Sequence, residues 1–370
     1  MDELRCGQCA TIAPGVAPWR CLSCGSPLAL ELPPTDAATL AAEGAHGVWR
    51  YRGWLPDIDS VSLGEPTTAL VALPSERSTV FAKLEGGQPT GSFKDRGVSV
   101  TVAWLRSRGV REIVVDSSGN AGASFAAYAA RVDMRARVFV PADASPAKLL
   151  QVRAHGATVE TVPGPRSAAS EAARAALRTA GPEVAYASHL WQPAFLAGTA
   201  TLAYEVVEGL GGAPDVLIAP LGGGTLLLGA ALGFQRLRAA GLIDRLPRLV
   251  GVQATACAPL ARAFRDGTDD SRPVEPGPTI AEGIRIARPP RSREILAAIR
   301  ASRGAIVDVS DEDIVASLRQ LFAEGLFVEP TSAAAHAGLA KVATAGETVV
   351  VALTGHGSKA AATISDLLSG

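Results

Sequence analysis

The sequence predicts an α/β protein, built on a mostly parallel sheet with helices on both faces and carrying a small cysteine-rich module at its N-terminus. Short apolar runs such as VLIAP and VVVAL recur along the chain, and Ala- and Leu-rich stretches of helical character lie between them. Strands that are buried on both faces give this pattern. The chain has 370 residues, 48% of them hydrophobic, so it can bury a sizeable core.

From about residue 61 onward, strands and helices alternate. Pro146 opens one of the helices, and Ser145 is its expected N-cap. The expected strands are 112–116, 137–141, 157–162, 185–187, 215–220, 248–254, 305–310 and 347–353. The expected helices include 121–132, 146–157, 167–179, 193–210 and 226–237. Ligands of such sheets bind beyond the carboxyl ends of the strands, so the turns there are the places to look for function.

Charge and hydropathy exclude several classes of partner. The net charge of −1 gives no electrostatic footprint for nucleic acid or for an anionic membrane. The N-terminus, MDELRCGQC, lacks an apolar signal core, and the apolar runs elsewhere are too short to cross a bilayer. We therefore expect a soluble cytoplasmic protein with no nucleic-acid or membrane partner.

Four of the five cysteines form two knuckles near the N-terminus. Cys6 and Cys9 form the first CxxC pair, and Cys21 and Cys24 form the second. In a cytosolic chain this spacing predicts a closed structural zinc site with four cysteine ligands, whereas a secreted chain could use the same residues as disulfides. A ribbon that has lost its metal is the other alternative. The module carries few basic residues, which favours a docking or folding role over nucleic-acid binding.

These features divide the chain into three segments. Residues 1–32 are the zinc-ribbon-like module, and residues 33–60 are a linker that begins at a Pro-Pro pair. The aromatic residues Trp49, Tyr51 and Trp54 suggest that this linker packs on the main body. Residues 61–370 form the main α/β domain.

Three turns after expected strands have compositions suited to ligand binding. In Asp116-Ser-Ser-Gly-Asn-Ala121 the small residues allow a close backbone approach, and the following helix N-terminus favours an anion. Pro220-Leu-Gly-Gly-Gly-Thr225 can cradle a phosphate with backbone N–H groups. Thr354 ends the strand ETVVVAL, where its hydroxyl can hydrogen-bond a heteroaromatic ring nitrogen and, as a poor counter-ion, leave that nitrogen largely unprotonated.

The stretch PTGSFKDRG, residues 89–97, supplies a fourth part. Its lysine, Lys94, is either an ordinary surface charge or a nucleophile held in a pocket. A nucleophilic lysine, a phosphate cradle, an oriented Asn120 and a ring-nitrogen hydroxyl are together the parts that hold pyridoxal phosphate as a Schiff base.

At these residues the chain resembles the threonine synthase family, pyridoxal-phosphate enzymes of the tryptophan-synthase β fold type. The resemblance is carried by KLEGGQPTGSFKDRG, SSGNAGASFAAYAAR, GTATLAYEV, VEPTSAAAHAGL, LTGHGSK and the earlier LGEPTTAL, and it covers roughly residues 61–370. It implies a two-subdomain, three-layer αβα catalytic domain of PLP fold type II. Residues of about 94–190 would be a smaller mobile subdomain, and the protein a homodimer.

The resemblance also implies a role for each matching residue. Lys94 would be the Schiff-base lysine and proton shuttle, Asn120 would contact the cofactor's 3-hydroxyl oxygen, and Thr354 would lie at the pyridine nitrogen. The cofactor phosphate would be held by Gly222, Gly223, Gly224 and Thr225. The amino-acid substrate would be bound by Thr90, Ser92, Ser117, Ser118, Gly119 and Ala121. A second anion site would draw on Lys148 and Gln151, with Arg153, Lys83 and Arg96 as further candidates.

The implied activity is the conversion of O-phosphohomoserine and water to threonine and phosphate by a pyridoxal-phosphate dependent lyase. Three departures from the family pattern leave the substrate open: LGGGT in the phosphate loop, Ala360 after Lys359, and the segment 281–285, AEGIR, which is also at home in dehydratase-like members. A threonine/serine dehydratase and a β-replacement synthase are the alternatives on the same scaffold. A retired cofactor fold that serves as an interaction module is the non-enzymatic alternative.

Overall fold

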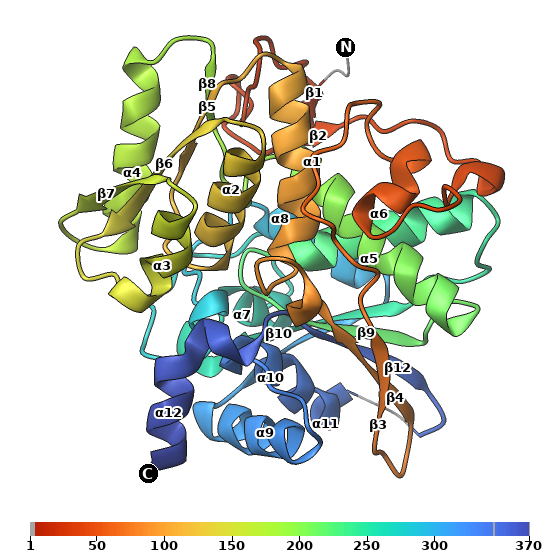
Figure 1. The fold of residues 1–370 in the computed structure, drawn as a ribbon. Coiled ribbons are helices and arrows are strands. Elements are labelled where there is room, and N and C mark those ends of the chain that lie inside the picture. Colours follow the sequence, from red (N-terminus) through yellow and green to blue (C-terminus); the bar gives the residue numbers. More distant parts are fainter. Residues whose placement is uncertain (1–3, 343–344, 370) are drawn as a thin grey trace. The chain divides into compact units, whose positions relative to one another are not determined.

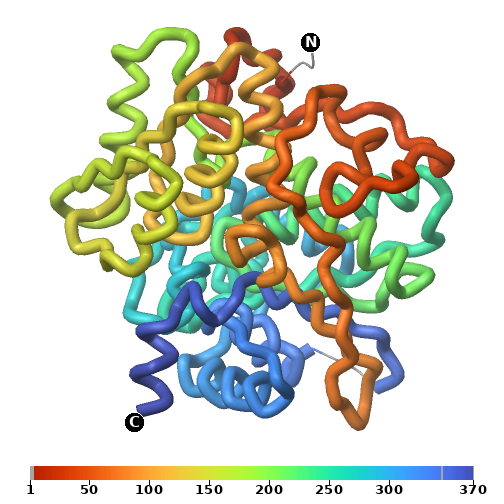
Figure 2. The backbone as a smooth tube through the Cα atoms, in the orientation of Figure 1, coloured from red at the N-terminus to blue at the C-terminus, as the bar shows by residue number. Residues whose placement is uncertain are grey.

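The computed structural model describes residues 4–342 and 345–369 (Figures 1 and 2). The chain forms two compact units. Unit 1 contains residues 4–65 and 94–199, and unit 2 contains residues 66–93 and the described residues from 200 onward. The chain therefore passes from one unit to the other three times, and the second crossing falls between Phe93 and Lys94.

Unit 2 is built on a six-stranded sheet with the strand order β11-β10-β9-β12-β4-β3. All neighbouring strands are parallel except β3, which pairs antiparallel with β4 at one edge. The strands are β3 (Leu70–Leu73), β4 (Thr79–Leu84), β9 (Val216–Pro220), β10 (Arg248–Ala254), β11 (Ala305–Val309) and β12 (Thr348–Leu353). The central strand β9 is buried at every position, as expected for a strand covered on both faces.

Helices cover both faces of this sheet. One face packs its aliphatic residues against α9 (Asp311–Ala323), α10 (Pro330–Ala337) and α12 (Ala361–Ser369) in a single buried cluster. The other face carries α6 (Thr225–Ala239) and α8 (Ser292–Ala301), which contact β10. The remaining helices are α5 (Ala194–Leu210), whose first residues belong to unit 1, α7 (Pro259–Arg265) and the short α11 (Leu339–Val342).

Unit 1 contains a smaller, fully parallel sheet with the strand order β7-β6-β5-β8. Its strands are β5 (Glu112–Val115), β6 (Arg135–Pro141), β7 (Thr158–Val162) and β8 (Val184–Tyr186). Its helices are α1 (Lys94–Ser107), α2 (Asn120–Arg131), α3 (Pro146–Ala154) and α4 (Arg166–Ala176). The cysteine module adds the antiparallel pair β1 (Leu4–Cys6) and β2 (Leu28–Leu30).

Aromatic side chains join the N-terminal segments to the rest of unit 1. The ring of Trp19, in the cysteine module, lies edge-on to the rings of Tyr186 and Trp191, with centroids 5.0 Å away in each case. In the 3-10 helix Val48–Trp54, the Trp49 indole donates to the hydroxyl of Ser99 on α1 at 2.7 Å. These contacts bury apolar surface where the short N-terminal elements could not form a core of their own.

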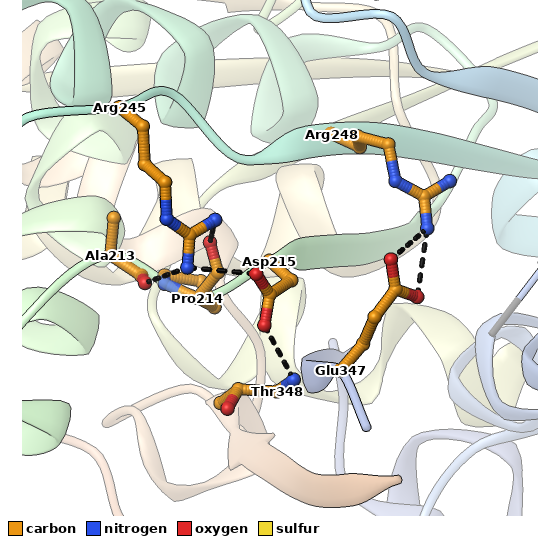
Figure 3. Close-up of polar contacts among 7 residues, drawn as sticks. All are labelled: Ala213, Pro214, Asp215, Arg245, Arg248, Glu347 and Thr348. Carbon is orange, nitrogen blue, oxygen red and sulfur yellow. Dashed lines mark hydrogen bonds and ion pairs between the residues drawn. The ribbon is translucent and has the colours of Figure 1, made fainter. Parts of the chain in front are cut away.

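Exposed ion pairs bind together the amino ends of three strands of the six-stranded sheet (Figure 3). Asp215, just before β9, lies 2.8 Å from Arg245 and accepts the backbone N–H of Thr348, the first residue of β12. Arg248, the first residue of β10, meets Glu347 at 2.7 Å. The arginine side chains are one third to one half exposed, so each pair contributes roughly 0–1 kcal/mol.

The observed elements confirm the predicted α/β fold class. Two details differ. The hairpin of β3 and β4 was not among the expected strands, although its antiparallel edge strand is compatible with a mostly parallel sheet. Ser145 does occupy the N-cap position before α3, but its side chain makes no capping hydrogen bond. Within the described part of the chain, no helix is both long and apolar enough to cross a membrane.

Candidate active site

The glycine-rich turn after β9, which was expected to cradle a phosphate, leaves little room for side chains. Gly224 precedes α6 with φ +74°, a left-handed conformation that favours glycine, and no side chain caps the helix there. A Cβ atom on Gly222 would lie 2.9 Å from the Cα of Ile284, and a Cβ on Gly224 would collide with Ile295. The start of this 15-residue helix thus lacks a side-chain cap, and only glycine fits the turn before it.

The turn after β12 places three buried oxygen groups close together. Thr354 follows the last residue of β12 and is 2% exposed. Its hydroxyl oxygen lies 3.4 Å from the hydroxyl of Ser332 and 3.5 Å from a carboxylate oxygen of Glu329. Strands β9 and β12 are neighbours in the sheet, so this turn and the glycine turn follow adjacent strands at the same edge.

The loop that leads to Lys94 is bonded to the Thr354 turn. The N–H of Phe93 donates to the carbonyl of Thr354 at 3.0 Å, and the N–H of His356 donates to the carbonyl of Gly91 at 2.9 Å. Ser92 pairs with Gly355 in an isolated antiparallel bridge. The expected site residue Ser92 is therefore held by backbone contacts next to another, Thr354, and Thr90 lies two residues before Ser92 in the same loop.

Two side chains of this loop are buried without a hydrogen-bond partner among the described residues. They are the hydroxyl of Ser92 and the side-chain amide of Gln88, with residue exposures of 0% and 3%. A buried polar group without a partner is costly, so native proteins keep such groups where a ligand or water completes the bonding. Ser92 was among the expected pocket residues, whereas Gln88 was not.

Lys94 is the first residue of α1 and is partly buried. Its ammonium lies 5.9 Å from the centroid of the Phe195 ring. Gly97, one turn further along α1, lets this ring approach, since a Cβ there would lie 2.5 Å from the ring carbons. The neighbouring Asp95 accepts a 2.6 Å hydrogen bond from Ser124 on α2, so this carboxylate ties two helices of unit 1 together.

His189 is a further residue of unit 1, and the sequence motifs indicated no role for it. Its ring is 8% exposed and lies 5.8 Å from the Phe195 ring that Lys94 also faces. Burial, helped by the charges of Lys94 and Arg166, holds the pKa of His189 well below its usual value. The imidazole is therefore neutral at physiological pH. Nothing in the local sequence, ASHLWQP, distinguishes it from a structural core histidine.

The turn between β5 and α2 contains the expected carboxylate-binding residues. Gly119 precedes α2 without a side-chain cap, and Asn120 is the first helical residue. Ser117 is buried and its carbonyl packs against Gly122, while Ser118 is half-buried. Asp116, at the start of this turn, accepts a 2.6 Å hydrogen bond from Ser170 and so links the turn to α4. Of the expected second-anion residues on α3, Lys148 and Arg153 are exposed and Gln151 is half-buried.

Lys83 is not available as an anion ligand, contrary to one expectation from the sequence. Its ammonium is 1% exposed and lies 2.6 Å from a carboxylate oxygen of Glu205 and 2.6 Å from the carbonyl of Thr68. The Thr68 hydroxyl donates to the buried Glu85 at 2.8 Å. The lysine charge is therefore balanced inside unit 2 by Glu205, and Lys83 fixes the carboxyl end of β4 instead of binding substrate.

The four N-terminal thiols have the geometry of a metal site. Their sulfur atoms all lie within 4.8 Å of one another, and the Cys6–Cys24 and Cys9–Cys21 pairs are 3.4 and 3.6 Å apart. Sulfurs of a tetrahedral zinc site are about 3.8 Å apart, as follows from zinc–sulfur bonds of about 2.3 Å. Hydrogen bonds from Thr11 lower the pKa of the Cys9 thiol to about 6, whereas burial raises the pKa of the Cys6 thiol to about 11, so without a metal only the first is readily a thiolate.

Comparison with known proteins shows to which family the chain belongs. A family model described as pyridoxal-phosphate dependent enzyme matches residues 61–355. The chain belongs to this family of pyridoxal-phosphate dependent enzymes. Its fold and its relatives confirm the family resemblance, the fold class and the lyase class that the sequence motifs had indicated.

The relatives of this pyridoxal-phosphate dependent enzyme include threonine synthases of distant organisms. The protein from Mycobacterium leprae is 38% identical over 84% of this chain and 87% of its own length. The protein from Methanocaldococcus jannaschii is 36% identical over 85% and 80%. Among solved structures, a threonine deaminase from T.th. aligns with a TM-score of 0.63 and 28% identity over 75% of this chain and 87% of its own. The enzyme is thus threonine synthase-like.

Proposed function

We propose that this enzyme converts O-phosphohomoserine and water to threonine and inorganic phosphate. The observation that carries the proposal is the similarity to threonine synthases, at 34–38% identity over about 85% of the chain. Apart from GTATLAYEV, which lies within α5, and LGEPTTAL, which leads into β3, the motifs that carry the resemblance lie at strand ends and helix starts, where α/β enzymes bind their ligands.

In this proposal each residue has a defined task toward the cofactor. Lys94 would carry the cofactor covalently, and the N–H groups of Gly222, Gly223, Gly224 and Thr225 would bind its phosphate. Asn120 would bond its 3-hydroxyl oxygen, and Thr354 would bond its ring nitrogen. The glycine cradle, where added Cβ atoms would collide with neighbouring residues, and the uncapped start of α6 support the phosphate assignment. When bound, the cofactor supplies an electron sink that acidifies the substrate's α-proton.

The protein residues then bind the substrate and move its protons. Backbone N–H groups at Ser117–Ala121 hold the substrate carboxylate at the start of α2, and Thr90 and Ser92 of the loop before Lys94 bind the same substrate. The freed Lys94 amine would remove the α-proton and then a β-proton, and phosphate would leave from the γ-carbon. A proton would then be returned to the γ-carbon, water would add its hydroxyl to the β-carbon, and a proton would be returned to the α-carbon, so that substrate plus water balances threonine plus phosphate. Lys148 and Gln151 bind the departing phosphate.

A substrate panel with product identification tests this function. Purified holoenzyme is given phosphohomoserine, threonine, serine and O-phosphoserine separately, and amino acids, 2-oxo acids, ammonia and phosphate are measured. We expect threonine and phosphate in equal amounts from phosphohomoserine. Phosphate release without threonine formation would refute the proposal.

A threonine/serine dehydratase is the second candidate function. It is favoured by the similarity to the threonine deaminase from T.th. and by the AEGIR segment, of which Gly283 packs against Thr331. The same panel separates the two functions, because a dehydratase releases ammonia and a 2-oxo acid from threonine or serine.

We further propose that Cys6, Cys9, Cys21 and Cys24 bind one structural zinc ion. The short sulfur–sulfur distances and the hydrogen bond from the N–H of Gln8 to the Cys6 sulfur support this assignment. Elemental analysis should find about one zinc per chain, and Cys9→Ser should reduce it. Zinc-free protein with four free thiols and unchanged stability would exclude the site.

The remaining proposals concern assembly and organisation. We propose that the protein is a cytoplasmic homodimer. In each chain, residues 1–32 would form the zinc ribbon, residues 33–60 a packing linker and residues 61–370 the catalytic domain. Residues of about 94–190 would be the mobile subdomain of that domain. Light scattering during size-exclusion chromatography of the holoenzyme gives its molecular mass, and the mass of a single chain would refute the dimer. Hydrogen exchange with and without phosphohomoserine tests whether 94–190 changes its protection on binding.

A further inference from the structure

A groove within unit 1 separates the cysteine module from α4. Its volume is about 1130 Å³, and ligand pockets in proteins measure roughly 300–1,000 Å³, so it can hold an organic molecule. One wall is the module loop at residues 14–22, and the other is α4 with the segment that leads to Val184, the first residue of β8. The groove therefore lies at the amino end of β8. The expected substrate turn at 116–121 follows the carboxyl end of the parallel neighbour β5, so the two lie at opposite ends of the sheet.

Both walls of the groove are mainly apolar. On the module loop, the side chains of Val16 and Leu22 are 40% and 75% exposed. On α4, Ala168, Ala172 and Ala175 repeat at helical spacing along one face. Exposed aliphatic side chains that face a hollow are costly in water, because apolar surface is more stable when it is buried. The walls therefore suit a ligand with an apolar body.

The charged residues of the groove are predominantly basic. They are Arg20, Arg174, Arg178 and Glu171, whose formal charges give +2, whereas the whole chain has a net charge of −1. Arg174 and Arg178 are four residues apart at the end of α4, a spacing at which like charges repel. In the part of the chain that the structure describes, neither has a hydrogen-bond or ion-pair partner. An anion bound between them would offset the repulsion and pair with both guanidinium groups.

We propose that this groove binds an amphipathic organic anion, which is an apolar or aromatic body with a carboxylate, sulfonate or phosphate group. The apolar body lies against Val16, Leu22 and the alanines of α4, and the anionic group pairs with Arg174 and Arg178. A bare inorganic anion would leave the apolar walls exposed to water. A neutral apolar molecule would leave the arginines unpaired. The inference does not depend on the proposed function, because the groove lies away from the turns assigned to cofactor and substrate.

The test uses the probe 8-anilinonaphthalene-1-sulfonate, whose fused rings and sulfonate match this chemistry and whose fluorescence rises in apolar surroundings. Holoenzyme is used, so that bound cofactor occupies the proposed phosphate cradle. We expect saturable binding of one probe per chain, with a Kd on the order of 10–100 μM that weakens with added salt. Hydrogen exchange with and without the probe should show protection at residues 14–22 and 168–184.

Variants of the groove separate its charge from its shape. Arg174→Gln/Arg178→Gln should weaken probe binding at least about tenfold, because two charge-assisted contacts are lost. Arg262→Gln/Arg319→Gln is the matched control. It removes the same charge at two exposed residues of unit 2 and should keep the wild-type Kd. Ala175→Trp keeps both arginines but fills the groove, and it should abolish binding. Circular dichroism and the absorption of the bound cofactor check that each variant is folded.

Three results would overturn the proposal. The first is an absence of saturable binding to the wild type, or equal Kd values for the two double variants. The second is protection confined to segments outside the two walls. The third is a lower molecular mass of Arg174→Gln/Arg178→Gln in light scattering, which would make the groove an interface between two copies of the chain. None of these measurements records turnover, so the proposed function can fail while this inference stands, and the reverse holds as well.

Discussion

The two ends of the six-stranded sheet in unit 2 are stabilised in opposite ways. At the amino end, partly exposed ion pairs tie β9, β10 and β12 together, and Asp215 also accepts a backbone N–H (Figure 3). At the carboxyl end, the turns are rich in glycine, and buried polar groups such as Ser92 and Gln88 have no partner among the described residues. At the amino end the polar groups satisfy one another, whereas the carboxyl end retains the local cost of unsatisfied groups that a ligand can use.

This contrast predicts a gradient of sensitivity. Substitutions at the carboxyl end should impair cofactor binding and turnover before they impair folding. Substitutions at the amino end should do little to either, because exposed ion pairs contribute little free energy. Four measurements can break or sharpen the comparison.

Removing the proposed cofactor lysine should have the largest effect. We expect Lys94→Ala to lose the visible absorption band of the bound cofactor and to lower kcat at least about a thousandfold, because no other group can replace a covalent nucleophile. Far-ultraviolet circular dichroism should stay unchanged. Lys341→Ala, at a partly exposed lysine paired with Asp313, is the control and should keep the band. Full activity in Lys94→Ala would remove the basis of the assignment.

A matched pair of glycines tests the anion cradle. Gly224 and Gly241 flank α6 and have nearly equal φ angles of +74° and +72°, but a Cβ atom would meet other residues only at Gly224. Gly241→Ala should cost about 1 kcal/mol in the free energy of unfolding and leave cofactor affinity unchanged. Gly224→Ala should cost about 2–3 kcal/mol and weaken cofactor binding at least tenfold. Equal affinities in the two variants would count against the cradle.

His189 extends the comparison to unit 1 through pH. Its pKa lies well below that of a histidine in an unfolded chain, about 6.5. Below pH 6.5 the imidazole therefore binds a proton in the unfolded state but not in the folded state. The free energy of unfolding falls as the pH drops. Well below pH 6.5 the slope is about 1.4 kcal/mol per pH unit for one proton. In urea denaturation, the free energy of unfolding of the wild type should therefore fall by about 1.4 kcal/mol more than that of His189→Gln between pH 7.5 and pH 5.5. Parallel pH profiles would contradict the buried, neutral imidazole.

The smallest effect is expected at the amino end. Arg248→Ala removes the ion pair with Glu347, in which the arginine side chain is one third exposed. We expect a loss of about 0–1 kcal/mol in the free energy of unfolding, weaker still at high salt, and unchanged kcat and KM. If Arg248→Ala lost as much activity as Gly224→Ala, the proposed difference between the amino and carboxyl ends of the sheet would be wrong.

The sequence predicted the parts of the fold and of the candidate site whose signal is local. The strands at 215–220 and 347–353 are continuous apolar runs, and the turns after them are recognisable by composition. Lys83 was misjudged because its partner Glu205 is far away in sequence, and no spacing rule relates the two. His189 escaped for the same reason, since its low pKa depends on neighbours that only folding supplies. The hairpin β3–β4 is short and partly exposed, so its periodicity is weak.

The pairing of β4 with β12 has a consequence for synthesis of the protein. Strand β4 ends at Leu84, but its parallel neighbour β12 begins only at Thr348. At a translation rate of about 5–20 residues per second, β4 waits on the order of tens of seconds for its partner. Unit 1 can fold during that time, because its last residue, Thr199, is made before synthesis reaches Thr348. The β3–β4 hairpin meanwhile remains an unpaired apolar edge, and it is the segment of the nascent chain that a chaperone would have most reason to cover.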